Sequence, residues 1–137
     1  MNDVQLGGTR ILPVVVLADA GQALRLGEAL AAGGIRTIEV TLRTPAALTA
    51  IETLAKETDL LVGAGTVLSA QQADEAVAAG ARYVLSPGFS AAVTRRCQDL
   101  GVPVIPGIAT WLAAPALLAA GDYAEITRRA AAAVALT

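Results

Sequence analysis

The sequence predicts an α/β protein built from about five repeats of a β-strand and an α-helix, with all strands parallel. Apolar runs alternate with alanine-rich helical segments along the first 110 residues. The centres of four successive runs, Ile38, Val62, Val84 and Val104, are spaced by 24, 22 and 20 residues. So short and regular a period is typical of right-handed βα units around one parallel sheet.

The first two predicted strands are apolar runs separated by a helix with a clear end. Residues 11–17 form the first run, and residues 20–32 follow as an alanine-rich helix that stops at Gly33-Gly34. Residues 37–42 form the second run, and Pro45 suits the first position of the next helix. Each strand thus leads directly into a helix.

The next three repeats are shorter but keep the same order. Residues 60–62 and 83–85 are the third and fourth predicted strands, with a helix over residues 70–79 between them. The helix after the fourth strand ends near Leu100, and residues 104–108 are the fifth strand. The resulting pattern contains five strands and four connecting helices.

The regular alternation stops after Thr110. Residues 111–120 predict a loop or a short helix interrupted by Pro115, and Asp122 is the expected N-cap of a terminal helix over residues 123–136. Five strands fall short of the eight in a closed βα barrel, which typically needs about 250 residues. From the pattern alone, an open parallel sheet of five strands is the alternative.

Composition narrows the class of protein. At 137 residues the chain fits one domain, and its 55% apolar content can bury a core. The net charge of −2 argues against a nucleic-acid partner. The longest apolar run is shorter than the ~20 residues that span a bilayer, and no signal peptide is recognisable, so we expect a cytoplasmic protein with no membrane partner. With no histidine and one cysteine, we expect neither an internal disulfide nor a metal site.

The second predicted strand carries polar residues that need an explanation. Because side chains alternate between the two faces of a strand, Glu39, Thr41 and Arg43 share one face. Parallel strands are usually buried on both faces, where a carboxylate is costly unless it meets a partner, a ligand or water. We therefore predict Glu39 as a general acid or base; a core glutamate paired with an arginine is the alternative.

Other candidates lie at the carboxyl ends of the strands, where ligands bind in parallel α/β proteins. Arg43 lies roughly 13 Å beyond Glu39 along an extended strand, where it could hold a carboxylate or phosphate, or be a plain surface arginine. Thr66 offers a hydroxyl to a ligand or to a helix N-terminus, although Ser69 is the better cap. The glycines of residues 63–65 do not complete a dinucleotide fingerprint.

Two residues with reactive side chains are predicted to be structural. Cys97 lies on a helix and has no histidine to activate it, so packing is its expected role. Lys56 is the one lysine of the chain and falls late in a helix beside Glu57. We expect it to be a solvated charge near the amino-end face of the sheet.

Four motifs, in order and spacing, resemble a known enzyme family. They are Ile-Glu-Val-Thr-Leu-Arg-Thr (38–44), Val-Gly-Ala-Gly-Thr-Val-Leu (62–68), Leu-Ser-Pro-Gly (85–88) and Val-Ile-Pro-Gly-Ile-Ala-Thr (104–110). They are similar to 2-keto-3-deoxy-6-phosphogluconate (KDPG) aldolase and to 4-hydroxy-2-oxoglutarate (KHG) aldolase, class I aldolases that form trimers of (β/α)8 barrels. The resemblance implies a truncated barrel: residues 1–110 would be five βα units, and residues 111–137 the last strand end and closing helix, with an internal deletion after Thr110.

The resemblance also implies roles for individual residues. In the family, a lysine forms a Schiff base with a pyruvate-type keto acid, and a glutamate matched by Glu39 moves protons. Arg43 and Thr66 match residues that hold the substrate carboxylate, while Pro87 and Gly107 would line the same pocket. The family reaction cleaves KDPG to pyruvate and glyceraldehyde 3-phosphate without a cofactor.

Two family motifs have no counterpart in this sequence. The Schiff-base lysine belongs to a Lys-Phe-Phe-Pro-like motif and the phosphate site to a Gly-Gly-Ile-like motif, and neither occurs here. Without an amine in the pocket an imine cannot form, so we expect little or no catalysis by this chain alone. The alternative is a non-catalytic half-barrel fragment or assembly module, whose two unpaired sheet edges could pair in a homo-oligomer.

Overall fold

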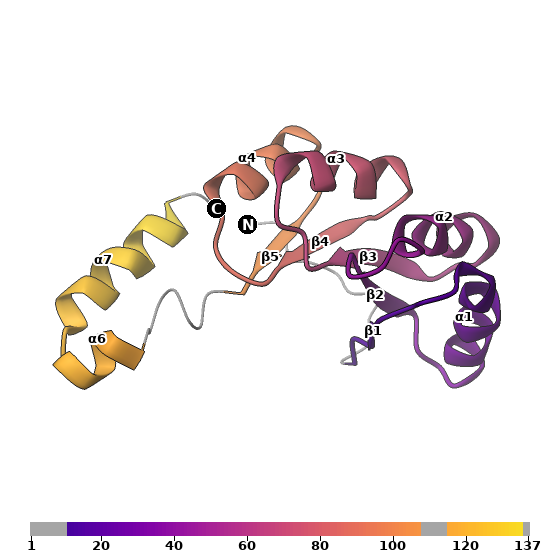
Figure 1. Cartoon of the computed structure of the whole chain (residues 1–137), viewed down its shortest axis with the longest axis horizontal. Helices are drawn as coiled ribbons and strands as arrows, with labels where there is room; N and C mark the ends of the chain where they lie inside the picture. The colour runs from indigo at the N-terminus through magenta and orange to yellow at the C-terminus, as the bar shows by residue number, and fades with distance from the viewer. Residues whose placement is uncertain (1–10, 108–114, 136–137) are drawn as a thin grey trace.

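The computed structural model describes residues 11–107 and 115–135, and it contains one parallel sheet with helices packed against it (Figure 1). The strands are β1 (Val14–Val15), β2 (Thr37–Thr41), β3 (Leu61–Gly65), β4 (Tyr83–Ser86) and β5 (Val104–Pro106). They lie side by side in the order of the chain, and every neighbouring pair is parallel. The predicted five-stranded parallel sheet is confirmed.

Helices alternate with the strands from β1 to β5, and within the described residues two further helices follow β5. After β1 comes a short 3₁₀ helix (Ala20–Gln22), followed by α1 (Ala23–Ala32), α2 (Ala47–Glu57), α3 (Ala70–Ala78), α4 (Ala91–Asp99), α6 (Pro115–Ala120) and α7 (Tyr123–Val134). A sequential strand order with crossovers of one hand places all connecting helices on the same face of the sheet. Figure 1 shows α1 to α4 as an arc along that face, with each helix in contact with the next. This is the arrangement of consecutive units in a βα barrel.

The two faces of the sheet have different chemistry. Side chains that point toward the helices are aliphatic and fully buried, and they join one core with residues of α2, α3 and α4; on the strands they are Ile38, Val40, Val62, Ala64 and Val84. Glu39 is in register with Gly63, and Gly63 with Tyr83, so these three residues lie on the opposite face. We call this opposite face, away from α1–α4, the inner face.

Tyr83 lies on the inner face and connects β4 to β2 and β3. Its side chain is buried, and its hydroxyl donates to the Ile38 carbonyl at 2.8 Å and lies 2.9 Å from Oγ1 of Thr37. Thr37 in turn donates to the Leu61 carbonyl at 3.0 Å. Burial raises the pKa of Tyr83 to about 12, so the phenol stays protonated and continues to donate.

Several element boundaries differ from the sequence prediction. β1 is limited to Val14–Val15 within the predicted run of residues 11–17, and β3 continues past the predicted end at Val62 to Gly65. The helix expected from Pro45 begins at Ala47, because the Thr44 carbonyl accepts a hydrogen bond from the Ala47 amide and so forms a turn first. Edge strands have one partner, which explains why β1 is so short.

The predicted caps are present where the structure describes them. Ser69 accepts a hydrogen bond from the Gln72 amide at the start of α3, and Asp122 accepts one from the Glu125 amide at the start of α7. The fifth predicted strand, residues 104–108, ends at Pro106, and Gly107 follows it outside the strand. Its last predicted residue, Ile108, and the predicted junction after Thr110 lie outside the described residues.

The two last helices form a pair of their own. α6 and α7 contact each other, and Figure 1 shows them to one side of the sheet. α7 carries an ion-pair cluster in which Glu125 binds both Arg128 and Arg129. Among the described helices, none has the length and apolar character needed to cross a bilayer.

Candidate functional site

Glu39 lies on the inner face of the sheet, on the strand next to its β1 edge. It occupies the middle of β2, in register with Val14 on one side and Gly63 on the other. Its side chain is only 6% exposed, and none of the hydrogen bonds or ion pairs among the described residues involves its carboxylate. A Cβ atom on Gly65 would overlap Oε1 of Glu39, so the carboxylate lies directly against the β3 backbone. The sequence prediction that Glu39 faces away from the helices is consistent with this placement.

The environment of Glu39 raises the pKa of its carboxyl group. Burial is the larger effect, because it disfavours the charged form, and the Arg43 guanidinium partly offsets it. A carboxyl group whose pKa moves toward neutrality exchanges protons more readily at physiological pH. The alternative of a glutamate held in a close ion pair is not seen: Arg43 acts on Glu39 through its charge without a direct ion pair.

Arg43 and Thr66 lie at the carboxyl ends of β2 and β3. Arg43 is exposed, and its Nε donates to Oγ1 of Thr66 at 3.4 Å. Thr66 has a φ of 58°, a left-handed conformation that is strained for a β-branched residue. The cap of α3 is Ser69, so the alternative role of Thr66 as that cap is wrong. One corner of the sheet is therefore lined by three functional groups: the carboxyl of Glu39, the guanidinium of Arg43 and the hydroxyl of Thr66. We call this region the Glu39 corner.

Pro87 and Gly107 lie at the same end of the sheet, beyond β4 and β5. The Gly107 amide donates to the Ser86 carbonyl at 2.7 Å, and a Cβ on Gly107 would lie 3.1 Å from the Pro87 carbonyl oxygen. Oγ of Ser86 donates to the Gly88 carbonyl at 2.8 Å. These contacts join the two strand ends to each other, and Pro87 and Gly107 remain candidate pocket residues on the far side from β2.

Sequence reasoning missed the residues that support this corner. Thr41 and Thr44 donate to the carbonyls of Val15 and Leu17 at 3.2 and 2.5 Å, and so connect β2 to β1. The ring of Tyr83 packs over Gly63, which is in register with Glu39. The negative charge of Glu39 raises the pKa of the Tyr83 phenol further. Thr37 and Thr41, which share the face of Glu39, are the one sequence signal that could have indicated these links.

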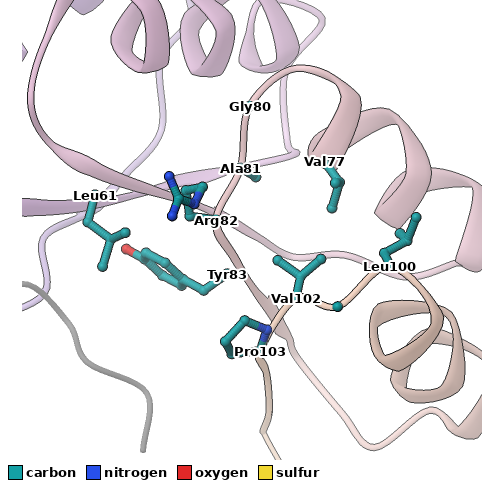
Figure 2. A pocket seen from close by; sticks show the side chains of 10 residues that line it. Leu61, Val77, Gly80, Ala81, Arg82, Tyr83, Leu100, Val102 and Pro103 are labelled. Carbon is teal, nitrogen blue, oxygen red and sulfur yellow. The ribbon is translucent and has the colours of Figure 1, made fainter. Parts of the chain in front are cut away.

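Two hollows of the described chain lie at the opposite end of the sheet. One, of about 430 Å³, is lined by residues at the amino ends of β3, β4 and β5, and Figure 2 shows Arg82 and Tyr83 on one side of it and Val102 and Pro103 on the other. A second, of about 250 Å³, lies at the amino ends of β2 and β3. Because parallel α/β proteins do their chemistry at the carboxyl ends, the Glu39 corner is the better candidate site.

Lys56 and Cys97 both lie on helices, away from this corner. Lys56 is on the exposed surface of α2 and forms an ion pair with Glu52 at 2.5 Å, and its hydrogen bond to Glu52 raises the pKa of its amine. Cys97 is fully buried in the helix layer, where burial, with Asp74 nearby, raises the pKa of its thiol. The predicted placements are confirmed: Lys56 is a solvated surface charge and Cys97 is packed in the core. Within the described ranges, no cluster of three or more potential metal ligands occurs.

The coupling between Arg43 and Glu39 is directly testable. We expect Arg43→Gln to raise the pKa of the Glu39 carboxyl, because it removes the positive charge that favours the ionised form. The carboxyl would then stay protonated to a higher pH, as followed by its ¹³C chemical shift during an NMR titration. The control is Arg25→Gln on α1, an exposed arginine that does not contribute to the Glu39 shift. An unchanged Glu39 titration in Arg43→Gln would contradict the coupling.

Comparison with known proteins supports the assignment of the fold. Residues 3–123 match the family described as KDPG and KHG aldolase. The chain is 51% identical over 102 residues to a 2-dehydro-3-deoxy-phosphogluconate aldolase of Treponema pallidum, covering 74% of this chain and 49% of that protein. It is 44% identical over 101 residues to the KHG/KDPG aldolase of Escherichia coli K12, covering 73% and 47%.

A solved relative has the same architecture. The KDPG aldolase of Legionella pneumophila, crystallised with pyruvate captured as a covalent carbinolamine intermediate, is 47% identical and superposes with a TM-score of 0.69, covering 72% of this chain and 48% of that one. This chain therefore spans about half the length of the relatives that it matches. Its five parallel βα units are those of a TIM-barrel-like aldolase, and the chain belongs to the KDPG and KHG aldolase family.

Proposed function

We propose that the Glu39 corner binds a pyruvate-type 2-keto acid, the substrate class of the aldolase lineage that cleaves KDPG to pyruvate and glyceraldehyde 3-phosphate. One observation carries the proposal: Glu39 is only 6% exposed and lies against Gly65, and its carboxyl group has no hydrogen-bond partner among the described residues. Leaving such a group unpaired is costly unless a ligand or water meets it. The carbinolamine of pyruvate in the Legionella relative supports the same ligand class.

Each residue has a role in this proposal that follows from its position. The planar fork of Arg43, at the exposed rim, would hold the keto-acid carboxylate, with the Thr66 hydroxyl beside it. Glu39, deeper in the sheet and with a raised pKa, would exchange a proton with the carbon next to the keto group. Pro87 and Gly107 would close the pocket from the ends of β4 and β5.

We propose that this chain binds the keto acid without forming an imine, and so does not complete the lyase reaction by itself. Imine formation needs an unprotonated amine within reach of the keto carbon. The single lysine, Lys56, is on the outer helix layer and is held protonated by Glu52.

We also propose that residues 1–110 are the first five βα units of the barrel, and that residues 111–137 correspond to its last strand end and closing helix.

Reductive trapping tests the absence of a Schiff base. We expect no mass increase after incubation with pyruvate and borohydride, because no side-chain amine reaches the Glu39 corner. Intact-mass spectrometry followed by peptide mapping is the measurement. Lys56→Arg is the matched control, since it separates a reaction at the lysine from a reaction at the amino terminus. A pyruvate adduct that maps to Lys56 would overturn this part of the proposal.

Ligand binding is measured separately from trapping. Line broadening of [¹³C]pyruvate on addition of the protein reports binding without chemistry, and Arg43→Ala is expected to weaken it about tenfold or more. A pyruvate line that broadens equally with the wild type and with Arg43→Ala would show that Arg43 does not hold the carboxylate.

The second candidate function is a non-catalytic assembly module. It is favoured by the open edges of the sheet among the described residues.

A further inference from the structure

Two glycines of β3 leave space on the inner face, and side chains from the two neighbouring strands fill it. A Cβ atom on Gly63 would overlap the ring of Tyr83, which comes from β4. A Cβ atom on Gly65 would overlap Oε1 of Glu39, which comes from β2. The ring therefore lies over the first glycine and the carboxyl group over the second.

The place over Gly63 is the nearer of the two for the Glu39 side chain. Glu39 is in register with Gly63, whereas Gly65 is in register with Thr41, two residues further along β2. The glutamate side chain could therefore extend straight across β3 or lean toward the carboxyl ends of the strands. It leans toward the carboxyl ends, while the Tyr83 ring occupies the nearer place.

The Tyr83 ring is tethered to the strand that carries Glu39. Its hydroxyl donates to the Ile38 carbonyl at 2.8 Å and lies 2.9 Å from Oγ1 of Thr37, so it cannot swing away freely. Figure 2 shows the side chain directed toward Leu61 of β3. The negative charge of Glu39 raises the pKa of the phenol, as expected for a carboxylate close to the ring.

We propose that Tyr83 is a positioning residue for Glu39. Its ring fills the space over Gly63, so the Glu39 carboxyl group is directed over Gly65 and toward the rim where Arg43 lies. The inference rests on the proposed function, because it gives Tyr83 a part in presenting the carboxyl group to the keto acid. A residue that only packs would lower stability when truncated, whereas loss of this ring should change the direction of the Glu39 side chain.

NMR of the free protein tests this direction without any ligand. In the wild type we expect nuclear Overhauser contacts from the Glu39 γ protons to the Gly65 α protons, and from the Glu39 β protons to the Tyr83 ring. Tyr83→Ala should replace the Gly65 contacts by contacts with Gly63, because the nearer place is then empty. Tyr83→Phe keeps the ring and loses only the hydroxyl, so it should keep the wild-type contacts.

Ile51→Ala is the matched control. Ile51 is fully buried on α2, in the core on the helix side of the sheet, so its truncation also leaves a cavity but away from the inner face. We expect this variant to lose stability and to keep the contacts between Glu39 and Gly65. Contacts that persist in Tyr83→Ala, or that are also lost in Ile51→Ala, would overturn the positioning role.

Two of these measurements do not depend on the folding of Tyr83→Ala. A wild type without contacts between the Glu39 β protons and the Tyr83 ring would overturn the proposal. Loss of the Gly65 contacts in Tyr83→Phe would overturn it as well, because the effect would then belong to the hydroxyl instead of the ring.

Binding of [¹³C]pyruvate separates this inference from the proposed function. We expect Tyr83→Ala to weaken binding about tenfold or more, since displacement of a reacting group is costly, and Tyr83→Phe to bind as the wild type does. A wild type that does not bind pyruvate would overturn the proposed function, whereas the NMR contacts would still report the direction of Glu39. Unweakened binding by a Tyr83→Ala protein whose Glu39 contacts have moved would overturn the role of Tyr83 in presenting the carboxyl group.

Discussion

Replacing Gly63 by alanine is expected to destabilise the fold by about 3 kcal/mol, the upper end for overpacking a tight core. A Cβ at this position would overlap the ring of Tyr83, and the overlapping atoms belong to a rigid aromatic ring instead of a flexible chain end. The ring cannot move away freely, because it is buried and its hydroxyl is held by Thr37 and by the Ile38 carbonyl. The strain must therefore be taken up by the backbones of β3 and β4.

Urea unfolding followed by circular dichroism measures this loss as a change in the free energy of unfolding. The decisive comparison is a double-mutant cycle with Tyr83→Ala, in which the cost of Gly63→Ala should fall to about 1 kcal/mol or less, because the ring is gone. Gly33→Ala is the control: its φ is −78°, and an added Cβ would make only ordinary contacts. An equal cost of Gly63→Ala with and without Tyr83 would show that the ring is not the cause.

The sheet could be predicted from the sequence because its repeat is short and its strands alternate regularly. Spacings of 24, 22 and 20 residues leave room for one helix between strands, which fixes parallel pairing and sequential order. The length of β1 was not predictable, because the apolar run of residues 11–17 does not show how many of its residues find a partner. Pairing with β2 alone limits it to Val14–Val15.

The site was predictable where it depends on alternation along one strand. The polar face of residues 39–43 follows from a period of two, and the structure places Glu39 on the inner face and Arg43 at the rim. What the sequence does not contain is the register between strands. It therefore could not show that Gly63 makes room for Tyr83, or that Thr66 adopts a positive φ.

Gly65→Ala is expected to weaken pyruvate binding about tenfold or more, since small displacements of a reacting group are costly. An added Cβ would overlap Oε1 of Glu39 and lie within 2.9 Å of its Cγ, so the whole side chain must rotate out of its place. Unlike the Tyr83 ring, this side chain is flexible, and the free energy of unfolding should change by only about 1 kcal/mol. A large loss of binding with a small loss of stability is therefore the expected signature.

The comparison that isolates this effect uses Glu39→Ala. If Gly65 acts by making room for the carboxylate, Gly65→Ala should weaken [¹³C]pyruvate binding in the wild type but have no further effect in the Glu39→Ala background. Loss of binding in both backgrounds would mean that the ligand itself approaches the Gly65 backbone. Unchanged binding in the single variant would mean that the carboxylate does not meet the keto acid. Gly65 would then hold Glu39 in a purely structural position, and the unpaired carboxyl group would need water as its partner.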